Sequence, residues 1–135
     1  MKPLLLEFCG LNSYAKPARV DFEALCSRGL FGIFGPTGSG KSTVLDAITI
    51  ALYGRAPRVN SRDLSALIGA QGDSNGKMTV RVTFAAWQRE QERRFRIERL
   101  YSLSGASKFR MVELRPEGDV VLAEKLGELN ARVNE

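Results

Sequence analysis

A glycine-rich run that ends in a lysine and a hydroxyl side chain is the part of this sequence best equipped for chemistry. It matches the phosphate-binding pattern G-x-x-x-x-G-K-[ST] and reads Gly35-Pro36-Thr37-Gly38-Ser39-Gly40-Lys41-Ser42. Glycines let the backbone turn successive N–H groups toward one phosphate, and the positive end of a following helix favours the same anion. The run therefore predicts a site for a nucleoside triphosphate, ATP together with Mg²⁺.

Individual roles follow from the pattern. Lys41 brings a positive charge to the β- and γ-phosphates and is the one catalytic residue that the sequence predicts. Ser42 offers its hydroxyl to Mg²⁺, and Thr43 is expected at the α-phosphate. The predicted nucleotide-binding residues of this loop are Gly35, Pro36, Thr37, Gly38, Ser39, Gly40, Lys41, Ser42 and Thr43.

A phosphate loop of this kind needs a strand before it and a helix after it. The short apolar run at 29–34 is bounded by glycines and predicts a buried strand. Apolar residues at helical spacing after Ser42 predict a helix that stops at Gly54. Other patterns predict strands at 4–9, 18–22, 78–84, 94–101, 108–114 and 120–122, a short helix at 63–68 and a last helix from 123 to 133. We therefore expect a mixed α/β fold, with a strand–P-loop–helix core and a basic antiparallel β-sheet.

The net charge of +5 is unevenly distributed. Between Lys77 and Arg115 the sequence has ten basic residues and four acidic ones. Such an excess suits a polyanion, and Arg94, Arg96 and Arg99 are candidates for contacts with the phosphates of duplex DNA. A sheet with one hydrated, charged face would show the same pattern, so that alternative stays open.

Several classes of phosphate-binding enzyme fit the sequence poorly. A GTPase needs D-x-x-G followed by N-K-x-D, whereas the nearest approach to the second motif, at 60–63, lacks the lysine and precedes the first. The chain has no histidine, which excludes histidine acid–base catalysis. An ABC-type ATPase also needs a glutamine loop, a signature helix and a strand that ends in Asp-Glu, and the segment 103–107 that imitates the signature predicts a hairpin turn. The sequence therefore predicts a phosphate site without the acid that positions the attacking water.

The residues around the loop resemble one ATPase family closely. The segments 30–48 and 51–58 are similar to the N-terminal region of the SbcC family, whose members are SMC-like ABC ATPases, and residues 1–22 resemble the start of that region. In that family a coiled coil separates an N-terminal lobe, with the P-loop, from a C-terminal lobe with the signature and the catalytic acids. The resemblance implies that residues 1–135 form one N-terminal lobe of a split head, without the coiled coil and the C-terminal lobe.

The same resemblance implies partners and further contacts. ATP would lie between two heads of a homodimer, and ATP-driven engagement would control a SbcD-type nuclease on duplex DNA. Asn12, Ser13 and Tyr14 would approach the base and ribose, and Arg55, Arg58 and Arg62 would lie near the nucleotide or DNA. The implied function is ATP binding in the ATPase subunit of an exonuclease that processes DNA double-strand breaks. Two alternatives remain: an ATP-binding subunit of transporter type, and a chromosome-structuring SMC head without nuclease.

The location of the protein follows from the lengths of its apolar runs. None approaches the roughly 20 residues of a membrane-spanning helix, and Glu7 interrupts the run that begins at Leu4. We therefore expect no membrane partner and a cytoplasmic, nucleoid-associated protein. Cys9 and Cys26 have no metal-ligand or redox spacing and are expected to be free thiols.

Overall fold

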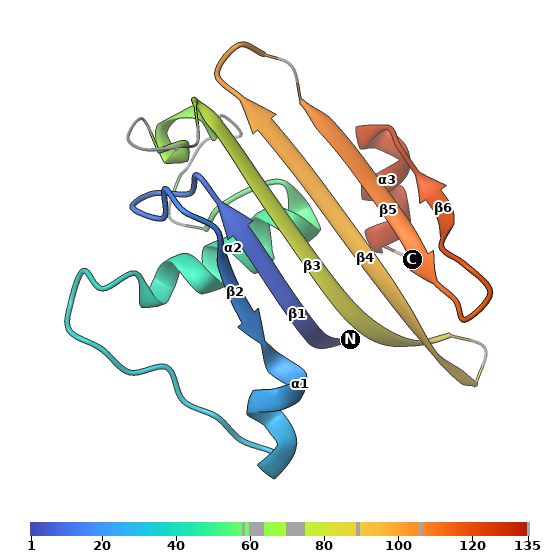
Figure 1. The fold of residues 1–135 in the computed structure, drawn as a ribbon. Coiled ribbons are helices and arrows are strands. Elements are labelled where there is room, and N and C mark those ends of the chain that lie inside the picture. Colours follow the sequence, from blue (N-terminus) through green and yellow to red (C-terminus); the bar gives the residue numbers. More distant parts are fainter. Residues whose placement is uncertain (58, 60–63, 70–74, 89, 106, 135) are drawn as a thin grey trace.

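A single antiparallel sheet dominates the computed structural model, which describes residues 1–57, 59, 64–69, 75–88, 90–105 and 107–134 (Figure 1). Its strands lie in the order β2-β1-β3-β4-β5-β6. Every neighbouring pair is antiparallel. The strands are β1 (Lys2–Cys9), β2 (Ala18–Asp21), β3 (Lys77–Gln88), β4 (Gln91–Ser102), β5 (Lys108–Leu114) and β6 (Val120–Ala123).

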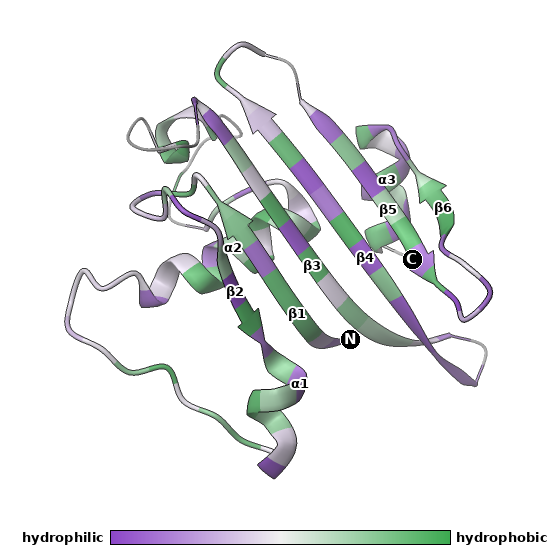
Figure 2. Cartoon of the chain, in the orientation of Figure 1, coloured by the Kyte–Doolittle hydropathy of each residue, from purple (hydrophilic) through white to green (hydrophobic). Residues whose placement is uncertain are grey.

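One face of this sheet carries the hydrophobic core. Side chains alternate along β1, β3 and β4, so that every second residue is buried, and Figure 2 shows the matching alternation of hydrophobic and hydrophilic residues. The most deeply buried of these apolar side chains are Leu6, Met78, Val80, Val82 and Ile97, each with 0% exposure. The other face remains hydrated, which explains why charged residues alternate with apolar ones in the sequence.

Two helices cover the apolar face: α2 (Lys41–Tyr53) and α3 (Leu126–Asn134) (Figure 1). α2 ends at Gly54, whose left-handed backbone (φ 66°) lets its N–H donate to the Ile50 carbonyl at 2.8 Å. The remaining elements are α1 (Phe22–Leu25) and two short 3₁₀ turns (Cys26–Arg28 and Ser65–Leu67). In the ranges that the structure describes, no helix combines the length and apolar character needed to cross a membrane.

Most of the expected elements are present, and the predicted mixed α/β class with a basic antiparallel sheet is confirmed. Three differences concern boundaries. The second strand stops at Asp21, because the Asp21 carboxylate accepts from the Ala24 N–H at 3.0 Å and begins α1. The expected helix at 63–68 is the turn Ser65–Leu67, and residue 63 lies outside the described residues. The last helix begins at Leu126 because β6 extends to Ala123. Cys9 and Cys26 are free, as expected.

The buried strand predicted at 29–34 is wrong. Residues 30–36 form no regular structure and extend away from the sheet (Figure 1). Leu30 is 86% and Phe34 92% exposed. A strand needs a neighbour to satisfy its backbone N–H and C=O groups, and no described strand pairs with this segment. The apolar run that precedes the phosphate loop is therefore a solvent-exposed connection here.

Candidate phosphate-binding site

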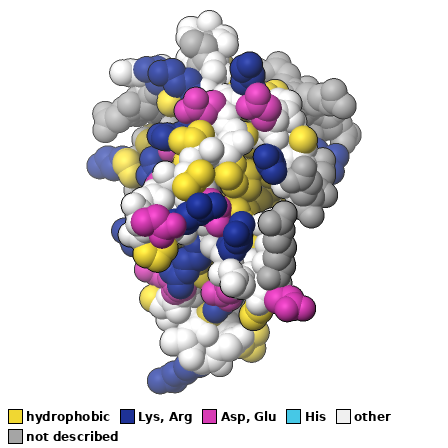
Figure 3. Space-filling model, turned by 90° about the vertical axis from the view of Figure 1, so that its right-hand side faces the viewer, with side chains coloured by type: hydrophobic (Ala, Val, Ile, Leu, Met, Phe, Trp, Pro, Cys, Tyr) yellow, Lys and Arg dark blue, Asp and Glu magenta, His cyan; other side chains and the backbone are white. Residues whose placement is uncertain are grey.

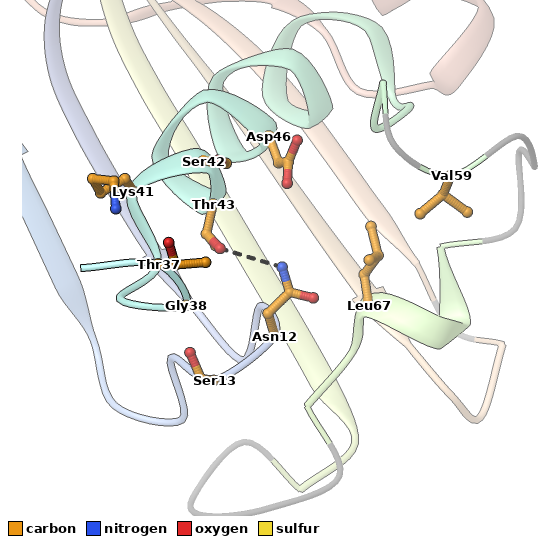
Figure 4. A pocket seen from close by; sticks show the side chains of 11 residues that line it. Asn12, Ser13, Thr37, Gly38, Lys41, Ser42, Thr43, Asp46, Val59 and Leu67 are labelled. Atoms are coloured by element: carbon orange, nitrogen blue, oxygen red, sulfur yellow. Dashed lines mark hydrogen bonds between the residues drawn. The ribbon is translucent and has the colours of Figure 1, made fainter. Parts of the chain in front are cut away.

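A cleft of about 680 Å³ lies at the N-terminal end of α2 (Figure 4). The phosphate loop and the first turns of α2 form one wall, while the loop after β1 and the segment near the second 3₁₀ turn form the others. Its lining consists of Asn12, Ser13, Thr37, Gly38, Gly40, Lys41, Ser42, Thr43, Asp46, Val59 and Leu67. The structure thus brings together most of the residues that the sequence assigned to the nucleotide.

The turn of the loop depends on two glycines with left-handed backbones. Gly38 has φ 82° and Gly40 has φ 87°, which other residues adopt only with strain. Gly40 precedes the first residue of α2, and its carbonyl accepts from the Thr43 N–H at 3.0 Å. The cleft therefore lies at the N-terminal end of a 13-residue helix, where the helix dipole favours an anion.

Lys41 is held against the loop that precedes it. Its ammonium group donates to the carbonyls of Gly35 at 2.6 Å and Pro36 at 2.7 Å, and approaches the Ser39 hydroxyl at 3.4 Å. These three acceptors match the three donors of an ammonium group. A phosphate that enters the cleft must therefore replace at least one of them. Gly35, Pro36 and Ser39 do not line the cleft and act on it through Lys41.

Tyr14 contacts the last turn of the phosphate loop. Its hydroxyl donates to the Gly40 carbonyl at 3.5 Å, and its ring packs edge-on against Phe8 at 4.9 Å between centroids. A Cβ atom at Gly40 would lie 2.7 Å from the Tyr14 ring, so this contact itself requires a glycine. The resemblance placed Tyr14 at the base and ribose, but it is absent from the cleft lining and instead fixes the loop's last turn.

Asn12 and Ser13 do reach the cleft. Asn12 adopts a left-handed backbone (φ 51°) in the turn after β1. Its amide donates to the Thr43 hydroxyl at 3.4 Å, which is the dashed contact in Figure 4. This hydrogen bond joins the β1 turn to α2 across the site. The two residues are therefore placed to line the part of the cleft that lies beyond the phosphate loop.

Three lining residues were missed from the sequence. Asp46 is only 4% exposed and lies four residues after Ser42 on α2, so helical spacing from the motif could have indicated it. Val59 and Leu67 form the wall opposite Thr43 (Figure 4). Val59 belongs to a connection with no periodic pattern, and the helix predicted at 63–68 did not indicate that Leu67 lines the cleft.

The arginines predicted to contact nucleotide or DNA lie in different parts of the structure. Arg55 lines a separate cleft of about 470 Å³ beside the C-terminal end of α2. Arg58 and Arg62 lie outside the described residues. The prediction that Arg99 contacts DNA is wrong, because its side chain is on the core face of β4 with 0% exposure. Arg94 and Arg96 do lie on the hydrated face, where their side chains are 51% and 37% exposed.

The basic excess of 77–115 is offset by acids from other parts of the chain. Arg94 pairs with Glu23 at 3.0 Å and Arg96 pairs with Asp119 at 2.6 Å. Arg81 donates to Glu98 at 2.9 Å and also reaches Glu7 at 3.3 Å. In the side view of Figure 3, basic and acidic side chains are likewise interspersed.

One acid of the sheet is held between two arginines. Glu113 is 5% exposed and accepts from Arg115 at 2.6 Å, and Arg93 lies 3.4 Å from its other oxygen. The hydrogen bond from Arg115 lowers the pKa of Glu113 against the opposing effect of burial. The sheet therefore carries a network of mixed charges, and much of its basic excess is already paired.

Comparison with known proteins agrees with the resemblance seen in the sequence. The family model described as "AAA domain" matches residues 6–119. The SbcC component of the SbcCD nuclease from Bacillus subtilis is 39% identical over 140 residues, which cover all of this chain and 12% of that protein. The SbcC component from Clostridium acetobutylicum is 56% identical over 61 residues, 45% of this chain and 5% of that protein. A "Probable DNA double-strand break repair Rad50 ATPase" of Aquifex aeolicus is 32% identical over the whole chain and 12% of its own length.

Proposed function

The chain belongs to the AAA domain family, and on that basis we propose that it is the ATP-binding N-terminal lobe of a split ATPase head in a nuclease that processes DNA double-strand breaks. The observation that carries the proposal is the cleft at the start of α2, where Lys41, Ser42 and Thr43 meet the glycine turn. The Ser42 hydroxyl would hold Mg²⁺, and Lys41 would neutralise the β- and γ-phosphates. The names of the relatives favour this function over one in a membrane transporter.

The cleft supports binding better than hydrolysis. Asp46 is the one acidic side chain among the described residues that line it. It belongs to α2 and so approaches from the side of the phosphate loop. In phosphoryl transfer the attacking water stands in line with the leaving oxygen, on the far side of the γ-phosphate from the group that cradles the β-phosphate. The residue that positions this water is therefore expected from another lobe.

The exposed segment before the phosphate loop also supports a contribution from another lobe. Leu30, Ile33 and Phe34 are 86%, 43% and 92% exposed within a few residues of the phosphate site. Leu45, on the first turns of α2, adds a further 63% exposed side chain. Exposed apolar side chains of this size, close in sequence to a binding site, are candidates for an interaction surface. We propose that the C-terminal lobe covers them.

The assembled protein would act through engagement of two such heads. The chain spans only 12% of the length of the Bacillus subtilis relative. We propose that bound ATP holds two heads together as a homodimer, and that this engagement controls a SbcD-type nuclease on duplex DNA. Hydrolysis would then release the heads.

Nucleotide titration tests the proposal directly. Calorimetry with ATP, ADP and AMP in Mg²⁺ should show affinity that falls with each phosphate removed, because the loop contacts phosphates and not the base. Removal of Mg²⁺ by EDTA should weaken ATP binding, since Ser42 would hold the metal and the metal would offset the negative charge of the phosphates. Equal affinity for AMP and ATP, or no binding at all, would refute the phosphate site.

The DNA contact is tested by the salt dependence of binding. Arg94 and Arg96 are paired with Glu23 and Asp119, so these carboxylates compete with DNA phosphates for the two guanidinium groups. If both arginines contact phosphates, Arg94→Gln with Arg96→Gln should flatten the plot of log K against log salt by about 1.8. The double variant Lys16→Gln with Arg28→Gln removes the same charge from exposed positions off the sheet's central strands and should change the slope much less. An unchanged slope in the sheet variant would show that this face is only hydrated.

A further inference from the structure

Arg99 is the largest fully buried side chain of the chain's described part. It stands on the core face of β4, opposite Val80 on β3 and Phe109 on β5. Its guanidinium donates through Nε to the Ala51 carbonyl at 2.6 Å and through Nη2 to the Leu52 carbonyl at 2.8 Å. The same Nη2 donates to the Asn130 side chain on α3 at 3.1 Å. One residue thus joins the sheet, α2 and α3.

Carbonyl groups at the C-terminal end of α2 compensate the buried charge of Arg99. A buried charge costs several kcal/mol unless other groups compensate it, and no carboxylate forms an ion pair with Arg99 among the described residues. Ala51 and Leu52 lie in the last turn of α2, where carbonyls lack intrahelical partners and the helix dipole is negative. Phe109 contributes a ring whose centroid is 5.8 Å from the guanidinium carbon. Burial lowers the pKa of Arg99, and Tyr101 opposes this effect.

The contact is also close enough to constrain the neighbouring backbone. A Cβ atom at Gly54 would lie 3.1 Å from Nη1 of Arg99 and 3.2 Å from the Tyr101 hydroxyl. Gly54 has φ 66° in addition, so both space and backbone favour glycine there. The end of α2 is therefore fitted to the guanidinium.

We infer that Arg99 is a positioning residue for the phosphate site: by fixing the C-terminal end of α2 to β4 and α3, it fixes the N-terminal end that faces the phosphates. The 13 residues of α2 form a rod of about 20 Å. A tilt of about 3° at one end displaces the other by about 1 Å, a shift that matters in a preorganised site. Val44, Ala47, Ile50, Ala51 and Leu52 bury α2 in the core, and the directional hydrogen bonds from Arg99 add a fixed orientation to this non-directional packing.

The test compares nucleotide affinity in variants that remain folded. Arg99→Met removes all three hydrogen bonds and should weaken Mg²⁺-ATP binding about tenfold at a temperature where circular dichroism shows a folded chain. Ile97→Ala is the matched control, because it opens the same core face of β4 two residues away and leaves the α2 carbonyls paired. It should lower the melting temperature but keep the affinity within about twofold.

Arg99→Lys provides a second variant if the Arg99→Met variant fails to fold. Lysine keeps the charge but cannot span two carbonyls as a planar fork, so the affinity of this variant for Mg²⁺-ATP should fall about threefold. The inference rests on the proposed nucleotide binding, and wild-type titration separates the two. If wild type does not bind ATP, the proposed function fails. If wild type binds and folded Arg99 variants bind equally well, or if Ile97→Ala weakens binding as much as they do, Arg99 has only a structural role.

Discussion

Replacement of Lys41 by Ala should strongly reduce the preference of the chain for ATP over AMP. Lys41 lies at the edge of the cleft with an ammonium group that can exchange the Gly35 and Pro36 carbonyls for phosphate oxygens. Hydrogen bonds to charged groups contribute about 1.5–3 kcal/mol, which corresponds to roughly 10- to 150-fold in affinity. AMP ends at the α-phosphate, beyond the assigned reach of Lys41, and its binding should change little.

The Lys41→Ala variant allows a clean comparison because alanine suits the first turn of a helix. α2 should therefore remain intact, as circular dichroism can verify. Lys77→Ala, which removes an exposed lysine at the start of β3, is the matched control for the loss of one positive charge. It should leave ATP affinity within about twofold of wild type. Unchanged ATP affinity in Lys41→Ala would contradict the role assigned to this residue.

Local patterns in the sequence were sufficient for most of the fold. Alternation at 78–84 marked β3 because one face of the sheet is buried and the other hydrated. Gly54 marked the end of α2 because a left-handed residue closes the helix. The loop from Gly35 to Ser42 was equally clear, since its geometry depends on the spacing of glycines within one short run.

The failures of sequence reasoning have a common physical cause. The apolar run at 29–34 reads as a buried strand, but burial requires a partner strand that the described part of the chain does not supply. Arg99 falls in a basic, alternating stretch and reads as a surface charge, yet its register places it on the core face beside the α2 carbonyls. Val59 and Leu67 reach the cleft through a connection whose path no local pattern records. In each instance the outcome is set by contacts distant in sequence.

The largest effect on rate should come from completion of the site by a second lobe. On the proposed function the cleft would hold the phosphates from the side of α2, and Asp46, its one acidic side chain among the described lining residues, belongs to that same helix. Groups that orient the water and stabilise the transition-state charge contribute factors of about 100 or more in phosphoryl transfer. The isolated chain should therefore bind ATP but hydrolyse it at close to the background rate.

The most direct test measures ATP turnover by the chain alone and after addition of the second lobe that we propose. That lobe would be taken from the C-terminal part of the Bacillus subtilis relative, whose matching region is 39% identical to this chain over 140 residues. We predict that turnover rises about 100-fold or more on mixing, and that Lys41→Ala prevents the rise. Amide hydrogen exchange at 30–34 should slow at the same time, as the second lobe covers the exposed run. Robust turnover by the chain alone, with no change on mixing, would contradict the claim that this cleft is half of a shared site.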